Sequence, residues 1–194
     1  VKAIHIMGSS LSISENSRDA VYKMIDIALK ANPKVEISFD PNLRPEMLGI
    51  EETLRIVKPV LDVATIVLPS GEEAEMLANK KGDEKEACLI IFEKAPRCKI
   101  VVLKQGKQGA TAFYKSEDDY IDQVTAKSYP VEEIDATGAG DSFGGAFVVE
   151  YLKNIPIKEA LKFANAVGAM KVTHFGPIPN HNREEIIKFV NSFQ

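Results

Sequence analysis

One stretch decides the fold: Asp135-Ala136-Thr137-Gly138-Ala139-Gly140-Asp141-Ser142-Phe143-Gly144-Gly145-Ala146-Phe147. A glycine-rich turn runs directly into an apolar helix that begins near Asp141, because apolar residues recur there at helical spacing. These residues are Phe143, Ala146, Phe147 and Leu152. Gly138 and Gly140 can adopt backbone angles that other residues avoid, so successive N–H groups can face one concavity at the helix N-terminus. The stretch therefore predicts a binding site for an anion such as phosphate.

Asp141 needs an explanation at such a site, because its carboxylate would repel a resting phosphate. A carboxylate close to a substrate hydroxyl can act as a general base while backbone donors stabilise the transferred phosphoryl group. The alternative is a helix N-cap that bonds the amides of its own first turn. The residues alone leave both interpretations open.

The stretch Asp-Ala-Thr-Gly-Ala-Gly-Asp-Ser-Phe resembles the C-terminal signature of the ribokinase-like (PfkB) carbohydrate kinases, Asp-Thr-x-Gly-Ala-Gly-Asp-x-Phe. The resemblance implies that Asp141 is the catalytic base. It also implies that the amides of Gly138, Ala139 and Gly140 form the anion hole, and that ATP and Mg²⁺ are the cofactors.

Composition indicates one globular domain spanning residues 1–194, with 45% hydrophobic and 27% charged residues. A net charge of −4 without a long basic block argues against nucleic acid as a partner. No apolar run approaches the roughly 20 residues that cross a bilayer, and the start lacks a signal-peptide pattern. We therefore expect a cytoplasmic protein without a membrane partner.

Neither cysteine nor histidine spacing indicates a resident metal. Cys88 and Cys98 are far from Cys-x-x-Cys spacing, and we expect two reduced, packed thiols. His5, His174 and His181 are scattered and lack neighbours at metal-ligand spacing.

Strand and helix patterns alternate along the chain. Ser9 to Ser14 is expected as a polar turn, with Ser14 capping the helix that follows. Strands are expected at 1–7, 35–39, 64–68 and 99–103, a hairpin at 110–114 and 120–124 with its turn at 115–119, and helices at 20–29, 53–61, 72–79, 83–94, 141–153, 157–172 and 183–192. This alternation predicts an α/β fold, a three-layer α-β-α arrangement with a mostly parallel central sheet. The loops 40–44, 69–73 and 104–109 all follow strands, so they should converge on one edge of the sheet.

The loop Phe39-Asp40-Pro41-Asn42-Leu43-Arg44-Pro45 is similar to one in fructokinase-like and 2-keto-3-deoxygluconate kinase-like members of that family. Arg44 can pair with a carboxylate or phosphate, so it could hold an acidic sugar or the nucleotide phosphates. Asp40 and Asn42 could order the loop or the water shell of the metal, and Asn42 is a candidate substrate contact. The alternative is a surface loop shaped by its prolines.

Pro69-Ser70-Gly71-Glu72-Glu73 resembles the segment of the family in which a Glu helps to hold magnesium through water. That role falls on Glu73. Ser70 stands where many members have Asn, and it is the candidate phosphate or metal-water contact. The alternative is an acidic, solvated helix N-terminus.

Two further segments resemble the nucleotide-binding parts of the family. In Lys104-Gln105-Gly106-Lys107-Gln108-Gly109, the glycines would let the backbone approach the nucleotide, and Lys104 would reach its phosphates. In the helix 162–169, Asn165 would contact the nucleotide. The alternatives are a hairpin turn and a helix packed closely through small residues.

The resemblance covers the C-terminal two-thirds of a family member. The chain starts without methionine, within a strand pattern, so we expect a fragment lacking the N-terminal part of the sheet, a sugar-binding Gly-Gly motif and the β lid. Many members pair through that lid, which leaves open a homodimer of the full-length protein.

These observations favour a kinase that transfers phosphate from ATP to a sugar hydroxyl, with 2-keto-3-deoxygluconate or a related sugar acid as the first substrate and neutral sugars such as fructose as the alternative. A protein that binds nucleotide or sugar phosphate without turnover is the rival from another class. A Rossmann dehydrogenase is disfavoured because no Gly-x-Gly-x-x-Gly follows the first strand.

Overall fold

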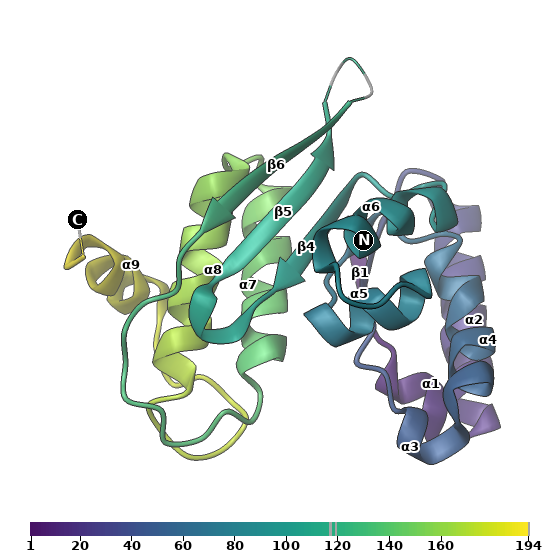
Figure 1. Ribbon diagram of the computed structural model, residues 1–194, viewed down its shortest axis with the longest axis horizontal. Helices are drawn as coiled ribbons and strands as arrows, with labels where there is room; N and C mark the ends of the chain where they lie inside the picture. Colours follow the sequence, from purple (N-terminus) through teal and green to yellow (C-terminus); the bar gives the residue numbers. More distant parts are fainter. Residues whose placement is uncertain (117, 119, 194) are drawn as a thin grey trace. The chain divides into compact units, whose positions relative to one another are not determined.

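The protein is described from a computed structural model that covers residues 1–116, 118 and 120–193. It divides into two compact units. The first contains Val1–Leu103 and Phe113–Asp122, and the second contains Lys104–Ala112 and Gln123–Gln194. Figure 1 gives the labels of the elements used below.

The strands are hydrogen bonded in the order β1 (Ala3–Met7), β2 (Glu36–Asp40), β3 (Ile66–Val67), β4 (Ile100–Lys104), β5 (Ala110–Lys115) and β6 (Ile121–Ala126). The first four pair in parallel, with Ile4 opposite Ile37, Phe39 opposite Val67 and Val67 opposite Val101. Strand β5 runs opposite to β6 in the hairpin (Figure 1). The predicted α/β class with a mostly parallel sheet is therefore confirmed, and the sheet is mixed.

Strand β3 is shorter than predicted, although the flanking residues still join the sheet. The Thr65 N–H donates to the Ile37 carbonyl at 2.8 Å, and the Leu68 N–H donates to the Phe39 carbonyl at 2.9 Å. The predicted hairpin is confirmed in both strands, and its turn at 115–119 includes residues 117 and 119, which lie outside the described part.

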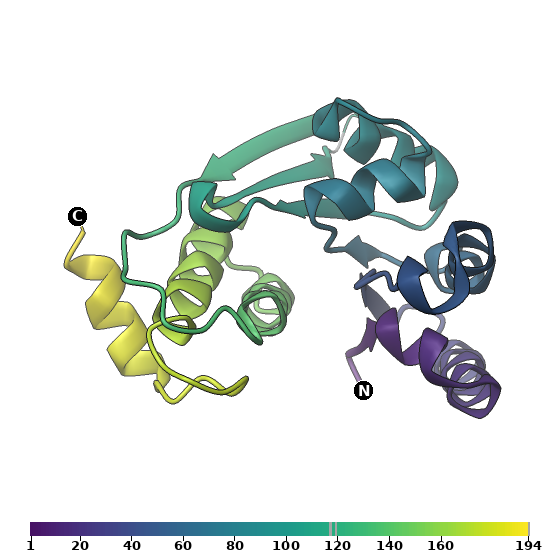
Figure 2. The ribbon, with the colours of Figure 1, turned by 60° about the horizontal axis from the view of Figure 1, so that its bottom comes forward.

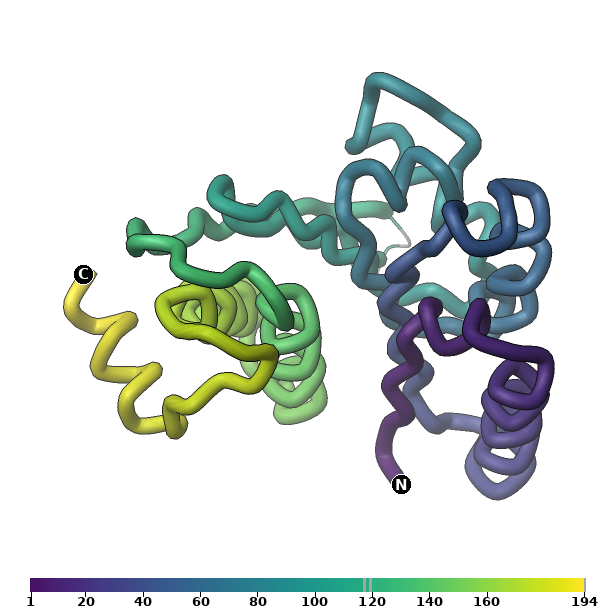
Figure 3. Tube along the Cα trace, turned by 90° about the horizontal axis from the view of Figure 1, so that it is seen from below, coloured from purple at the N-terminus to yellow at the C-terminus, as the bar shows by residue number. Residues whose placement is uncertain are grey.

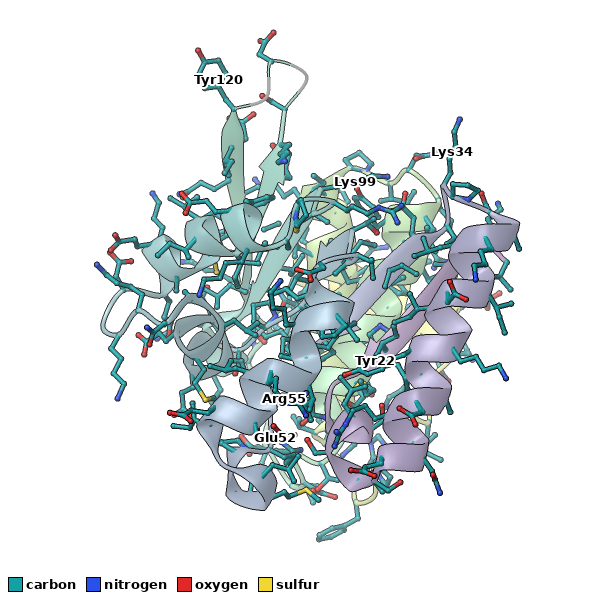
Figure 4. The ribbon with its side chains drawn as sticks, turned by 90° about the vertical axis from the view of Figure 1, so that its right-hand side faces the viewer. Tyr22, Lys34, Glu52, Arg55, Lys99 and Tyr120 are labelled. Carbon is teal, nitrogen blue, oxygen red and sulfur yellow. The ribbon has the colours of Figure 1, made fainter. Side chains whose placement is uncertain are left out.

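Six helices accompany β1 to β4 in the first unit. They are α1 (Ser9–Ile13), α2 (Glu15–Ala31), α3 (Pro45–Leu48), α4 (Ile50–Leu61), α5 (Gly71–Ala78) and α6 (Glu84–Lys94). Helix α4 packs beside α2, where the Tyr22 hydroxyl donates to the Ile56 carbonyl at 2.5 Å. Figure 4 shows Tyr22 with Arg55 and Glu52, which form an ion pair at 2.6 Å on α4. Fully buried Ile37, Phe39 and Val67 lie in the hydrophobic core of this unit.

The polar turn expected at Ser9 to Ser14 is wrong, because Ser9–Ile13 forms helix α1. Tertiary contacts override the polar composition: Leu11 is completely buried, and the Ser10 hydroxyl donates to the Met7 carbonyl. Ser14 is the N-cap of α2 as predicted, its hydroxyl accepting the Ser17 N–H at 3.1 Å.

The second unit is built on three helices. Helix α7 (Ala139–Leu152) packs along α8 (Ile157–Lys171), and α9 (Arg183–Asn191) crosses α8 (Figure 2). Small buried residues of α8, Ala160 and Ala164, permit the close packing of α7 against α8. A short 3₁₀ turn, η1 (Gly106–Gln108), follows β4.

Both cysteines are free and buried, as predicted. Burial raises the pKa of Cys88 and of Cys98 to about 12, so neither thiol is reactive near neutral pH. Within the described residues, no helix combines the length and apolar character needed to cross a membrane.

Candidate functional site

A cavity of about 680 Å³ lies within the second unit. Its walls come from the turn after β4, the segment after β6, and helices α7 and α8. Its lining residues include Lys104, Gly106, Lys107, Gly109, Tyr129, Pro130, Val131, Glu133, Ala139, Gly140, Phe143, Asn165, Gly168 and Val172. A largely apolar cavity with a few polar groups at one side is typical of a site for a small organic molecule.

The N-terminus of α7 forms one side of this cavity. Gly138 is the N-cap and has φ +78°, a conformation that other residues adopt only with strain. The backbone of the loop after α8 approaches so closely that a Cβ atom on Gly138 would lie 2.2 Å from the Pro177 carbonyl oxygen. Glycine is therefore required at this position for two independent reasons.

The first turn of α7 presents backbone donors. The Ala139 N–H is already engaged, donating to the Ala136 carbonyl at 3.1 Å. The Gly140 and Asp141 N–H groups have no acceptor among the residues that the structure describes. With the positive end of the helix dipole, these amides form a ready anion site. The amides available to an anion differ from those that the sequence predicted. The Ala139 amide is occupied by the Ala136 carbonyl, and the Asp141 amide is open.

Asp141 is exposed in the first turn of α7. The helix has no side-chain cap hydrogen bond, and its N-cap is Gly138. The alternative interpretation of Asp141 as an N-cap is therefore wrong. Asp141 carries its carboxylate in the same helical turn as the open amides, and its role as a general base stays a prediction.

Lys104, the last residue of β4, contributes positive charge to the same place. Its Nζ lies 3.8 Å from the position that a Cβ atom on Gly140 would occupy. A side chain at residue 140 would therefore reach the lysine nitrogen. The sequence separates Lys104 and Gly140 widely, and the fold places them at one side of the cavity.

Gly109 and Asn165 hold the segment that follows β6. A Cβ atom on Gly109, at φ +105°, would lie 2.1 Å from the Ala126 carbonyl oxygen. The Asn165 amide donates to the carbonyls of Ala126 at 2.9 Å and Lys127 at 3.2 Å. Asn165 thus lines the cavity and anchors its wall, and its contact with a nucleotide stays a prediction.

Sequence reasoning missed that wall. Tyr129, Pro130 and Val131 line the cavity, and Lys107 pairs with Glu133 at 3.0 Å. An available signal was the group of apolar residues with a proline between a strand and the glycine-rich turn. A non-regular segment keeps such residues only when they pack against something.

Asp135 fixes the start of the glycine-rich turn. One carboxylate oxygen accepts the Thr137 N–H at 2.9 Å, and the other accepts the Gly176 N–H at 2.9 Å. Hydrogen bonds from the Thr137 side chain and amide, and from the Gly176 amide, lower the pKa of Asp135 to about 2. Sequence reasoning gave Asp135 no separate role.

The remaining candidates lie in the first unit. Glu73 forms a capping box with Ser70, accepting the Ser70 N–H at 2.7 Å. Its second carboxylate oxygen accepts the Leu43 N–H at 3.1 Å. Of the three loops predicted to converge, 40–44 and 69–73 therefore meet, with Glu73 as the bridge, and the place of 104–109 beside them stays a prediction.

Arg44 and Asn42 lie in that bridged loop. The Arg44 guanidinium donates to the Leu43 carbonyl at 3.0 Å and lies 3.8 Å from Glu46, with 42% of its side chain exposed. Asn42 has φ +36°, which fixes the bend after Pro41. These two residues, with Ser70 and Glu73, belong to the first unit, whereas the other candidates belong to the second.

Comparison with known proteins adds independent evidence. The sequence profile described as "pfkB family carbohydrate kinase" matches residues 1–183. Fructokinase-1 of Oryza sativa subsp. japonica is 32% identical over 199 residues, which cover 98% of this chain and 59% of the relative. The 5-dehydro-2-deoxygluconokinase of Listeria monocytogenes serotype 4a (strain HCC23) is 30% identical over 174 residues, covering 89% of this chain and 51% of the relative.

A solved E. coli structure, a protein provisionally named ribokinase II in complex with ATP and Mg²⁺, has 38% identity and a TM-score of 0.86. The match covers 98% of this chain and 59% of that one. The chain thus spans somewhat more than half the length of these relatives.

Proposed function

The chain belongs to the pfkB family of carbohydrate kinases, and from this premise we propose that it is the nucleotide-binding part of an ATP-dependent sugar kinase. The observation that carries the proposal is the N-terminus of α7. There, Gly140 and Asp141 have open backbone amides, the Lys104 Nζ lies 3.8 Å from the position of a Cβ atom on Gly140, and Asp141 carries an exposed carboxylate in the same helical turn.

The proposed reaction assigns each group a step. Asp141 accepts the proton of a sugar hydroxyl as that oxygen bonds to the γ-phosphorus, and the bond from phosphorus to the oxygen of ADP breaks. The amides of Gly140 and Asp141 donate to the oxygens of the transferring group, where negative charge spreads. The Gly138 N–H, which likewise has no acceptor among the residues that the structure describes, would donate with them, and Gly138 also sets the backbone path.

The nucleotide would occupy the cavity. Apolar contacts from Val131, Phe143 and Val172 suit a flat heterocycle, and Lys104 lies on the side where phosphates would meet α7. Gly106 and Gly109 shape the turn that closes the wall. The E. coli relative, solved in complex with ATP and Mg²⁺, supports ATP as the nucleotide.

Magnesium would arrive with the nucleotide. No group of three or more His, Cys, Asp or Glu within the described ranges could hold a metal ion alone. Mg²⁺ commonly keeps several waters and binds through phosphates and one or two carboxylates. When bound, it would neutralise charge on the phosphates. Glu73 fits a role through water, because both its oxygens already accept backbone N–H groups.

A sugar acid such as 2-keto-3-deoxygluconate is the proposed substrate, held by Arg44 and oriented by Asn42. Among the described residues, the half-exposed guanidinium donates to the adjacent Leu43 carbonyl and lies 3.8 Å from Glu46. Both partners are near neighbours in the chain, so the guanidinium can turn toward a substrate carboxylate. The named activity of the Listeria relative concerns a related keto-deoxy compound. The rice relative, a fructokinase, supports fructose as the alternative.

The test measures ADP formation by the native full-length chain with Mg²⁺-ATP and a panel of 2-keto-3-deoxygluconate, fructose and ribose. Asp141→Asn is compared with Asp122→Asn, an exposed aspartate on β6 that is outside the cavity lining. We expect turnover with one sugar, a loss of about 10²- to 10⁴-fold in kcat for Asp141→Asn, and none for Asp122→Asn.

Direct binding of ATP by the 194-residue chain provides a second measurement. Binding that survives in Asp141→Asn while turnover is lost would support Asp141 as the base. Tight ATP binding by the full-length chain without turnover of any sugar would instead favour a nucleotide-binding protein without catalysis.

A further inference from the structure

Lys171, the last residue of α8, is completely buried, which is rare for a lysine. Its Nζ donates to the Asp135 carbonyl at 2.8 Å and to the His174 carbonyl at 3.3 Å. A carboxylate oxygen of Asp135 lies 3.9 Å away. A buried cation is tolerated only where other groups replace its water, and here two carbonyls accept hydrogen bonds from it while the nearby carboxylate supplies the opposite charge.

The two carbonyls belong to different loops of the second unit. Asp135 lies in the segment that enters α7, and His174 lies in the segment that leaves α8. Figures 1 and 2 show these segments side by side at one end of the two helices, and Figure 3 shows the same pair from below. Lys171 therefore joins two loops that no secondary structure connects.

The same loops are joined again nearer the anion site. The Gly176 N–H donates to the Asp135 carboxylate, and the Pro177 carbonyl packs where a side chain on Gly138 would be. The Val172 carbonyl accepts the N–H groups of Ile134 and Asp135 at 2.7 and 3.1 Å. Lys171 is the buried charged side chain at the centre of this network, and it lies outside the cavity lining.

We propose that Lys171 is a positioning residue. Its ammonium group bonds to the loops at Asp135 and His174, holds them together, and so fixes the conformation of the phosphate-binding turn. Two carbonyl oxygens and a carboxylate oxygen form the kind of oxygen shell that binds a small monovalent cation, and here the chain supplies the cation itself. Orientation of the Gly140 and Asp141 amides is thus established before the nucleotide arrives. The inference rests on the proposed nucleotide site and extends it to a residue that does not contact the ligand.

The first test compares Lys171→Met, which keeps an unbranched side chain without charge, with Lys162→Met on the same helix. Lys162 pairs with Glu159 and is 34% exposed. ATP affinity is measured on the 194-residue chain by titration calorimetry, well below the unfolding temperature of each variant. Turnover is measured on the full-length chain. We expect Lys171→Met to weaken ATP binding and lower kcat on the order of 10- to 100-fold, and Lys162→Met to resemble the parent.

The second test restores the cation from solution. Lys171→Ala leaves space beside the oxygen shell, so ammonium or methylammonium chloride should recover ATP affinity, and with it kcat. Tetramethylammonium chloride at the same ionic strength should not, because that ion is too large and has no N–H donor. A purely packing role for Lys171 would give no difference between the salts.

The outcomes separate the two proposals. If the parent binds ATP and Lys171→Met binds it equally well, the positioning role is overturned while the kinase proposal stands. If Lys171→Met does not fold, the salt comparison on Lys171→Ala decides, and equal affinity in both salts overturns the role. A parent that binds no ATP in either length of chain overturns the proposed function and this inference together.

Discussion

The backbone at Gly138 touches the backbone at Pro177 so closely that a Cβ atom on Gly138 would lie 2.2 Å from the Pro177 carbonyl oxygen. This contact holds the turn before α7 against the loop after α8. It leaves no room for adjustment, because both partners are main-chain atoms. The path of the phosphate-binding turn is thus fixed by a neighbour distant in sequence.

Replacement of Gly138 by alanine should therefore damage the site. The new Cβ must displace the Pro177 backbone, and φ +78° adds strain, so we expect destabilisation of about 1 to 3 kcal/mol and loss of ATP binding. Gly145→Ala on α7 is the matched control, since a Cβ there meets nothing within 4 Å. It should stabilise the helix by about 1 kcal/mol. Urea unfolding and calorimetry measure both effects, and equal behaviour of the two variants would contradict the argument.

Glu73→Gln should destabilise the first unit by roughly 1 to 3 kcal/mol. Its carboxylate accepts backbone N–H groups of Ser70 and Leu43 with separate oxygens, and an amide would turn a donor toward one of them. Glu72→Gln removes the same charge from the same exposed helix end and should change the free energy of unfolding by less than about 0.5 kcal/mol. Equal urea midpoints for these variants would refute the bridging role.

Asp135 should make stability depend on pH in the acid range. Its pKa is about 2 in the folded protein against an ordinary value of 3.8, because Thr137 and Gly176 donate hydrogen bonds to the carboxylate. A lowered pKa stabilises the fold above pH 4, and that contribution is lost as pH falls from about 4 to about 2. The difference in unfolding free energy between the parent and Asp135→Asn should shrink across this window. A difference that stays constant from pH 5 to pH 2.5 would show that the carboxylate is not the cause.

Arg44→Met should separate acidic from neutral sugars in the full-length chain. Loss of a guanidinium contact to a carboxylate should raise KM for a sugar acid roughly 10- to 100-fold and leave KM for fructose unchanged. Arg97→Met is the control, since Arg97 is partly exposed and donates only to the Pro33 carbonyl, among the contacts described. A parallel rise in KM for both sugar types would assign Arg44 to the nucleotide or to the loop.

Much of the fold could be predicted because its signals are local. Alternating apolar segments identified the strands, and Ser14, Ser70 and Asp83 begin their helices as side-chain caps. Helix α1 was missed for the opposite reason. Its serines look like a turn, and only the burial of Leu11 explains the helix.

The candidate site also has some residues that local sequence signals predict and others that they do not. The sequence predicted unusual backbone angles at Gly138 and Gly140. Gly138 has a positive φ, whereas Gly140 lies within α7 and does not. Lys171 gave no such signal, because a lysine in a helix is ordinarily a surface residue. The sequence also did not show that Glu73 accepts two backbone N–H groups, because its second partner, Leu43, lies thirty residues earlier.

The sequence by itself determined the alternation of strands and helices, the glycine-rich turn and the acidic residue at the start of α7, since each depends on residues adjacent in the chain. Only the tertiary structure decided which amides stay open and which are occupied, and which loops a buried lysine joins. The physical reason is that hydrogen-bond partners and burial are properties of segments brought together from distant parts of the chain. Local backbone preferences do not determine these hydrogen-bond partners or this burial.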